Sequence, residues 1–89
     1  MKTRRKSASL RTVLGKNVRI ERVRRDLSQE ALAHLVSTTQ SHLSEIERGL
    51  ASVQLDMIER LAAALSVEPM SLLDRAVNKH ALRSEASKD

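Results

Sequence analysis

The sequence predicts an all-α protein, a compact five-helix bundle with a flexible basic arm at its N-terminus. Apolar residues recur in five successive stretches at three- and four-residue steps, the spacing of one face of an α-helix. Residue types that favour helix ends separate these stretches. The 89 residues are enough for one small domain and too few for a second core. We therefore divide the chain into a disordered arm at 1–11, a helical domain at 12–79 and a polar tail at 80–89.

The composition excludes several classes of protein. The chain has no cysteine, which rules out disulfides, thiolate catalysis and cysteine metal sites. It has no run of about 20 apolar residues that could span a bilayer, and its start lacks the core of a signal peptide. We therefore expect a soluble cytoplasmic protein with no membrane partner. Without Phe, Tyr or Trp the core is thin, and small cores of this kind often gain stability by association.

Charge is distributed unevenly along the chain. Residues 1–25 contain ten basic side chains and one acidic one, a net charge of +9, whereas residues 26–89 contain six basic and ten acidic ones, a net charge of −4; together they give the overall +5. A basic front on an otherwise acidic chain indicates a polyanion partner that touches one side of the molecule. The alternative is a basic tail that only improves solubility.

The first helix is expected at about Thr12–Asp26. It follows an arm with almost nothing to bury, which should be disordered when free. Leu14 and Val18 share one face of the helix, and basic residues fill much of its circumference. Gly15 costs up to ~1 kcal/mol against alanine within a helix, which leaves a later start open.

Two short helices joined by a tight turn are expected in Leu27–Gly49. Ser28 can cap the first helix through its hydroxyl oxygen. A Ser-Thr-Thr sequence then interrupts the apolar pattern, and Thr39 can cap a second helix that begins at Gln40. Gly49 suits the left-handed residue that follows a helix. The apolar residues that define these two helices are Leu32, Leu35, Val36, Leu43 and Ile46.

Two further helices are expected in the C-terminal half. One runs from about Gln54 to Leu65, and Pro69 marks the first turn of the last, where no helical donor is lost. Leu73 and Val77 exceed what one small core needs, so we expect them at a dimer interface. The other apolar positions expected to pack inside are Leu55, Ile58, Leu61, Ala62, Leu65, Met70, Leu72 and Ala76.

The helix that begins at Gln40 leaves a polar face outside. Gln40, Ser41, Ser44 and Glu45 lie mostly away from its apolar residues, and all four side chains form hydrogen bonds. Their spacing would let one helix face present several donors and acceptors to the edges of base pairs. A polar helix face is usually only solvated, however, and periodicity alone favours that simpler interpretation.

The same stretch resembles the helix-turn-helix of the Cro and phage-repressor type, often called the Xre family. The matching residues, in register and without a gap, are Ser28-Gln29-Glu30, Leu32-Ala33, Ser44 and Ile46-Glu47-Arg48-Gly49. Thr38-Thr39-Gln40 resembles the turn and the start of the recognition helix in lambdoid phage repressors. Similarity covers about Leu14–Leu73, where the family has two more helices. This ungapped series is specific, and it outweighs the interpretation as a solvated face.

The resemblance implies how these residues would meet DNA. The recognition helix, Gln40–Arg48, enters the major groove from its N-terminal end, while the helix Gln29–Val36 crosses the backbone with its first N–H groups toward a phosphate. The side chains expected at the bases are Gln40, Ser41, Ser44 and Glu45. Those expected at phosphates are Arg22, Ser28, Gln29, Thr39, His42, Arg48 and Ser52 and, from the basic arm, Arg4, Arg5 and Lys6.

Two of the base contacts carry sequence preference. Gln40 can form two hydrogen bonds to adenine N6 and N7, worth about 1–3 kcal/mol of discrimination. Glu45 can accept from cytosine N4, or it can repel wrong sequences. Ser41 and Glu45 stand where related repressors often carry glutamines, so the operator does not follow from the resemblance.

An ion pair is implied as well. In phage repressors an arginine on the first helix pairs with the glutamate that matches Glu47, and the corresponding arginine in this chain is Arg22. Such a pair would tie the first helix to the recognition helix. The alternative is two ordinary surface charges, worth under about 1 kcal/mol.

The chain departs from the family in two places. Glu21 stands at a position that is often apolar, and Ile20 at one that is often polar, which leaves the packing of the first helix open. The loop Leu50–Val53 lacks the basic residues that hold the DNA backbone in several phage repressors. The contacts to the DNA backbone would then come from Ser52, from backbone N–H groups and from the N-terminal arm.

Together these features predict a sequence-specific regulator of transcription that binds double-stranded DNA. A repressor is the favoured type of regulator. Two copies related by a two-fold axis would read a palindrome with half-sites about 34 Å apart. A phage-type repressor, a restriction–modification controller and a general transcription factor stay open. An antitoxin that covers a partner toxin and regulates its own promoter is the alternative. No enzyme, cofactor or metal site is expected, because the three histidines lack metal-site spacing and there is no glycine-rich phosphate loop.

Overall fold

The computed structural model describes residues 9–76, which form helices joined by turns and loops and contain no strand. The elements follow in the order α1 (Leu10–Arg24), α2 (Gln29–Leu35), α3 (Gln40–Glu47), α4 (Leu55–Leu65) and the 3-10 helix η1 (Pro69–Leu73). The predicted all-α class is confirmed. The fifth predicted helix is instead this 3-10 helix of five residues, after which Arg75 and Ala76 begin another helical turn at the end of the described range.

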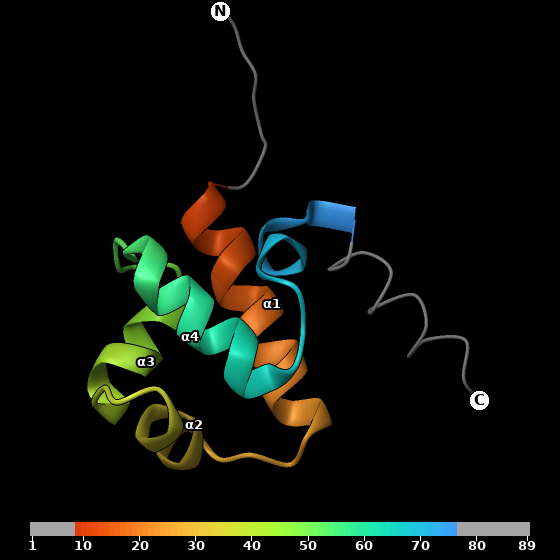
Figure 1. Ribbon diagram of the computed structural model, residues 1–89. Coiled ribbons are helices and arrows are strands. Elements are labelled where there is room, and N and C mark those ends of the chain that lie inside the picture. The colour runs from red at the N-terminus through yellow and green to blue at the C-terminus, as the bar shows by residue number, and fades with distance from the viewer. Residues whose placement is uncertain (1–8, 77–89) are drawn as a thin grey trace, which may run out of the picture.

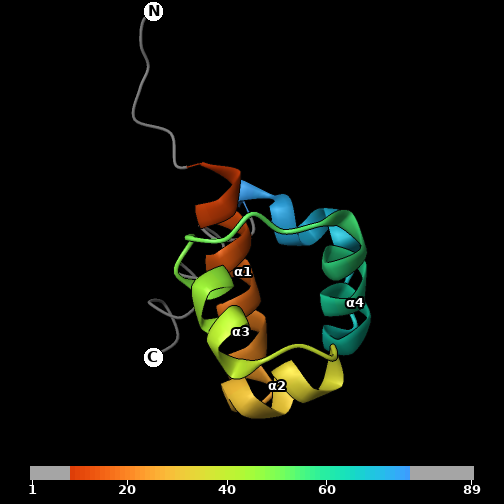
Figure 2. The ribbon, with the colours of Figure 1, turned by 90° about the vertical axis from the view of Figure 1, so that its left-hand side faces the viewer.

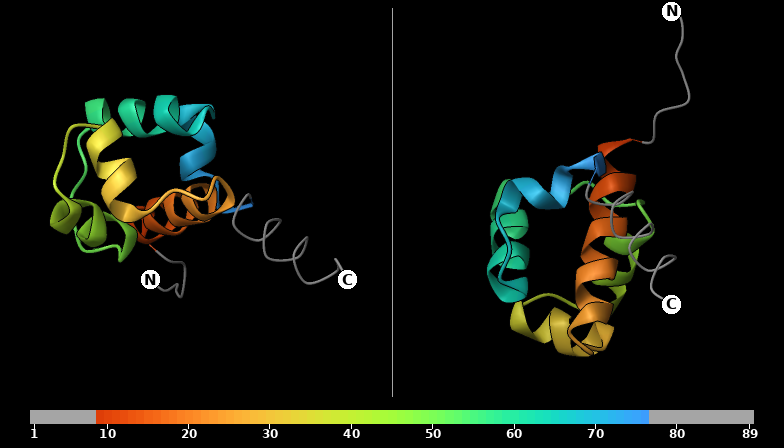
Figure 3. Two further views of the ribbon diagram at one scale, coloured as in Figure 1. Left: turned by 90° about the horizontal axis from the view of Figure 1, so that it is seen from below. Right: turned by 90° about the vertical axis from the view of Figure 1, so that its right-hand side faces the viewer.

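The elements form a frame with one helix outside it. α1, α2, α4 and η1 are the four sides (Figure 3), and α3 lies along the outside of α1 near α2 (Figure 2). Figure 1 shows α2 and α3 together on the side of the molecule away from η1. This arrangement presents the outer face of α3 to solvent. Within residues 9–76, every helix is too short or too polar to cross a membrane.

Aliphatic side chains fill the frame. Leu43 and Ile46 anchor α3, and both are completely buried in the common core. Burying a side chain of this size contributes about 1.5–3 kcal/mol, which stabilises an eight-residue helix that would be marginal alone. The other large apolar side chains with almost no exposed surface are Val18, Leu32, Val36, Leu61, Leu65 and Leu72.

Several apolar side chains predicted to pack inside lie on the surface instead. Leu35 and Leu55 are 57% and 77% exposed, because they are the last residue of α2 and the first of α4, at the margin of the core. Met70 is 75% exposed. With three residues per turn in η1, Met70 and Leu73 stack on one side while Leu72 alone is fully buried. Ala76 is also exposed.

The first helix begins at Leu10, two residues before its predicted start. Ser9 caps it, with its Oγ accepting from the backbone N–H of Thr12 at 3.3 Å. Leu10 and Arg11, which the sequence analysis assigned to the arm, therefore belong to α1.

Gly15 lies within α1 and does not delay its start. A glycine is needed here because α1 crosses α3 at this residue. A Cβ atom at Gly15 would lie 2.7 Å from the carbonyl oxygen of Glu47 and closer still to that of Ile46. The two backbones therefore meet with no side chain between them, which only glycine permits. Gly49, with φ of 76°, then ends α3 as predicted and packs against Thr12.

Asn17 joins η1 to α1. Its buried Nδ2 donates to the carbonyl oxygens of Leu72 at 2.8 Å, Asp74 at 3.2 Å and Ser71 at 3.3 Å. Carbonyls at the end of a helix have no partner within the helix, so this amide satisfies them and fixes η1 in place.

Glu21 is buried although it is charged. Its carboxylate lies 2.6 Å from Arg25 Nη1 and 3.5 Å from Arg24 Nη1, one turn further along α1. The charge at this often apolar position is therefore met within the same helix.

Candidate nucleic-acid interface

The turn between α2 and α3 is built from local signals that the sequence shows. Ser28 Oγ accepts from the backbone N–H of Ala31 at 2.9 Å, and Thr39 Oγ1 accepts from that of His42 at 3.0 Å. Both predicted N-caps are therefore present. Ser37, with φ of 59°, reverses the chain between the two helices. These contacts fix where α3 begins and which of its faces turns outward.

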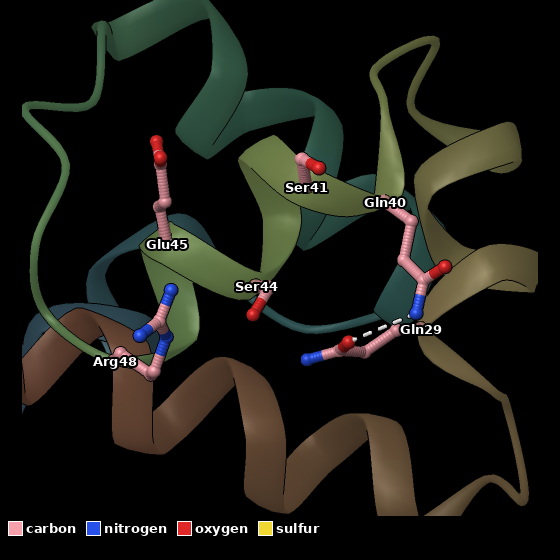
Figure 4. Close-up of a pocket in the computed structure, with 6 residues that line it drawn as sticks. All are labelled: Gln29, Gln40, Ser41, Ser44, Glu45 and Arg48. Atoms are coloured by element: carbon pink, nitrogen blue, oxygen red, sulfur yellow. Dashed lines mark hydrogen bonds between the residues drawn. The ribbon is translucent and has the colours of Figure 1, made fainter.

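The outward face of α3 is a polar row, which we define as Gln40, Ser41, Ser44, Glu45 and Arg48. Together with Gln29 from α2 these residues line one shallow surface pocket. Figure 4 shows Gln40 and Arg48 at opposite ends of the row with Ser44 between them. Ser44 is half-buried and the other four are exposed. The structure therefore brings the four side chains predicted at the bases onto one accessible surface.

A chain of hydrogen bonds holds this surface from beneath. Arg22 Nε and Nη2 donate to the two carboxylate oxygens of Glu47 at 2.6 and 3.0 Å. Gln29 Nε2 donates to Glu47 Oε1 at 3.0 Å, and Gln40 Nε2 donates to Gln29 Oε1 at 3.3 Å. The dashed line in Figure 4 marks this last bond. The network thus runs from α1 through the end of α3 and the start of α2 to the first residue of the polar row.

The ion pair within this network lies away from solvent. The side chains of Arg22 and Glu47 are 12% and 4% exposed. Arg22 Nη1 also donates to the carbonyl of Leu27 at 2.8 Å, so three of its five N–H groups have partners inside the protein. The Arg22–Glu47 contact is therefore a largely buried ion pair and not an ordinary surface pair. The phosphate contact of Arg22 stays a prediction.

The remaining residues predicted at phosphates are dispersed around the polar row. The hydroxyls of Ser28 and Thr39 act as helix caps. His42 is half-buried, and its Nδ1 lies 4.0 Å from Glu45 Oε1. Within residues 9–76, no cluster of three or more potential metal ligands includes this histidine. Arg4, Arg5, Lys6 and the predicted interface residue Val77 lie outside the described residues.

Arg11 is a basic residue at this surface that the sequence analysis missed. Its Nη2 donates to Ser52 Oγ at 2.6 Å, which places a guanidinium against the loop between α3 and α4. The loop has no basic residue of its own, so α1 supplies one. The signal was Ser9, a possible N-cap three residues before Thr12, which would have moved the helix start ahead of Arg11.

Comparison with known proteins shows which family has this geometry. A helix-turn-helix family model matches residues 18–72, more than half of the chain. The chain belongs to this helix-turn-helix family. The matched range contains α2, α3 and α4 in full, and the resemblance to the Cro and phage-repressor type is thereby confirmed.

Individual helix-turn-helix proteins are also similar. Control protein C.BamHI of Bacillus amyloliquefaciens is 40% identical over 67 residues, which are 74% of this chain and 83% of that protein. The crystal structure of the restriction-modification controller protein C.AhdI from Aeromonas hydrophila is 39% identical with a TM-score of 0.67, over 70% of this chain and 94% of that one.

A third helix-turn-helix relative extends over more of the chain. The clp gene regulator ClgR of Corynebacterium glutamicum is 26% identical with a TM-score of 0.77, over 91% of this chain and 86% of that one. Membership of this family makes the chain a DNA-binding transcription regulator and not an enzyme.

Proposed function

We propose that the protein represses transcription by binding a palindromic operator as a homodimer, with α3 of each copy in the major groove. The observation that carries the proposal is the polar row on α3, exposed to solvent and held from beneath by the Glu47 network. A solvated helix face needs no such support, whereas a surface that reads bases needs its side chains held in position. Similarity to the controller C.AhdI favours a restriction–modification controller among the regulator types left open.

Gln40 has the free hydrogen-bonding groups that adenine recognition requires. One N–H of its amide donates to Gln29, which leaves the second N–H and the carbonyl oxygen. Adenine presents N7 as an acceptor and N6 as a donor in the major groove, so the two remaining groups of Gln40 match it. Gln29 fixes the orientation of this amide, and its remaining amide N–H is the group that would donate to a phosphate.

Contacts to the DNA backbone come from residues around the row. Arg11 and Ser52 are exposed, and His42 is half-buried on α3. The basic arm, with Arg4, Arg5 and Lys6, adds phosphate contacts by virtue of its sequence. These contacts supply affinity that depends on salt rather than on sequence.

The dimer forms through the surface near η1. Met70 is exposed, whereas Leu73 is half-buried against the core, and both line one surface hollow. The predicted partner residue Val77 follows four residues after Leu73. Replacement of Met70 by glutamate should shift sedimentation from dimer to monomer, while the stability of the monomer stays nearly unchanged because Met70 is exposed. Sedimentation unchanged by M70E would place the interface elsewhere.

A selection of duplexes from a random library tests the proposal. The full chain should enrich a palindrome, and Gln40→Ala should lose the preference at one adenine in each half-site. Gln54→Ala is the matched control, since Gln54 is an exposed glutamine whose side chain forms no capping hydrogen bond. Lower expression from a promoter that contains the selected palindrome would establish repression, and higher expression would show activation instead. Failure to bind any duplex at low ionic strength would refute the proposal, and co-purification with an equimolar partner would then favour the antitoxin.

A further inference from the structure

Arg48 lies at the C-terminal end of the polar row, and its guanidinium forms no ion pair within residues 9–76. Arg22, Arg24 and Arg25 each face a carboxylate at 2.6 to 3.5 Å. Arg48 is exposed and has no such partner among residues 9–76, although it lines the same pocket as Gln40 and Glu45. A cation placed among base-reading side chains, and paired with none of them, is available to a ligand.

The backbone explains why Arg48 faces the same way as the rest of the row. Its φ and ψ of −88° and 0° are close to helical values, so it continues the turn of α3. Three and four residues before it stand Glu45 and Ser44, which share one face of a helix with it. Gly49 then turns the chain away with its positive φ. Arg48 is therefore the last residue of the polar row before the chain turns away from α3.

The charges around Arg48 distinguish a base from a phosphate as its target. Glu45 contributes a negative charge to the pocket and Arg48 a positive one, so this end of the row has no net attraction for a phosphate. A guanine–cytosine pair, in contrast, presents two acceptors, guanine O6 and N7, beside one donor, cytosine N4. The guanidinium matches the acceptors, and the carboxylate matches the donor.

We propose that Arg48 reads a guanine in the operator instead of the phosphate that the sequence analysis assigned to it. The proposal rests on the proposed function, because it places α3 in the major groove. From Gln40 to Arg48 the helix rises by roughly 12 Å, or eight residues at about 1.5 Å each. That is about three to four base-pair steps of 3.4 Å. Each half-site then contains an A·T pair read by Gln40 and, about three steps further along, a G·C pair read by Arg48 with Glu45 toward a cytosine N4.

The decisive experiment is the random-duplex selection repeated with Arg48→Lys, followed by titrations over a range of salt concentrations. Lysine keeps the charge and loses the planar fork that guanine needs. Preference at one G·C pair per half-site should fall by roughly 5- to 150-fold, the loss expected for one bidentate base contact. The salt dependence should stay unchanged. Arg60→Lys, on the exposed surface of α4, is the matched control and should retain the full preference.

The other outcomes are distinct. If Arg48 binds a phosphate, Arg48→Lys keeps the wild-type preference, while Arg48→Ala weakens binding to all duplexes equally and lowers the salt slope by about 0.9 per contact. That result would overturn the proposal. Gln40→Ala separates this from failure of the proposed function: if it relaxes one position and Arg48→Lys relaxes none, only the role of Arg48 is wrong. If the wild-type protein selects no sequence, the function itself is wrong.

Discussion

Glu47 joins three helices through a single carboxylate. It accepts from Arg22 on α1 and from Gln29 on α2, and it is the last residue of α3. With 4% of its side chain exposed, it has little access to water that could replace these partners. The orientation of Gln40 therefore depends, through Gln29, on a carboxylate buried behind the polar row.

Glu47→Gln should destabilise the fold strongly, because it leaves the guanidinium of Arg22 without its counter-charge. The expected loss of unfolding free energy is about 3–5 kcal/mol, measured by urea denaturation. Arg22→Met combined with it should cost less than the sum of the two single changes. Glu59→Gln, an exposed glutamate on α4, is the control and should stay within about 0.5 kcal/mol of wild type. A coupling near zero in this double-mutant cycle would show that the pair contributes little.

Gly15→Ala should also destabilise the protein, although alanine is the better helix former. The gain in helix propensity is about 1 kcal/mol at most. Against it stands a Cβ atom under 3.0 Å from the backbone carbonyls of Ile46 and Glu47, which cannot rotate away. Overpacking of this kind costs about 1–3 kcal/mol, so the net effect is a loss.

Thermal unfolding measures this loss, with Lys16→Ala as the control on the exposed side of the same helix. A Tm for Gly15→Ala at or above that of Lys16→Ala would mean that α1 and α3 do not meet through their backbones.

The sequence predicts the positions and contacts of some residues and not of others. Periodicity was enough to place Gln40 and Glu45 on one outer face, because the apolar positions of a short helix define its opposite side. The contact between Arg22 and Glu47 came from the family resemblance, since residues 25 positions apart share no local pattern. The bond between Arg11 and Ser52 does not follow from the sequence, because it joins residues 41 positions apart and requires α1 to begin before Arg11.

At the scale of elements, helix ends follow from local chemistry. Ser28, Thr39 and Gly49 lie at the ends where the sequence puts them, since a capping hydroxyl or a left-handed glycine acts within one turn. Exposure at those ends is set by tertiary contacts instead. Leu55 has the spacing of a buried residue and still lies outside, because it is the first residue of α4 and the core begins with Met57 and Ile58.

Thr39→Ala should cost about 1 kcal/mol of stability, because it removes the acceptor for the first free N–H groups of α3. The adjacent Thr38→Ala is the matched control, since Thr38 caps no helix, and it should change the free energy of unfolding by less than half as much. Chemical denaturation of the two variants side by side gives the comparison. Equal losses would show that the hydroxyl of Thr39 contributes nothing as a cap.

For the whole molecule, the separation of charge along the chain decides how binding depends on salt. Residues 1–8 carry four basic side chains, and α1 begins with Ser9 as its cap. Deletion of residues 1–8 removes the arm charges and leaves that cap in place. The slope of log affinity against log salt should become shallower by about 0.9 for each arm cation that touches a phosphate.

The variant without residues 1–8 should keep nearly the base preference of the full chain, as measured by duplex selection. Substitution of the four basic residues by glutamine in the full-length chain should reproduce the effect without shortening it. A salt slope identical to that of wild type in both variants would show that the arm makes no phosphate contact.

The crossing at Gly15 has a consequence for how such a regulator changes over generations. Because main chain rests directly on main chain there, the tilt of α3 is set without any side chain as a spacer. Under the proposed function, exchange of exposed residues on α3 changes which operator is read and leaves this contact in place, whereas a change at Gly15 or at the buried Leu43 and Ile46 shifts the whole polar row.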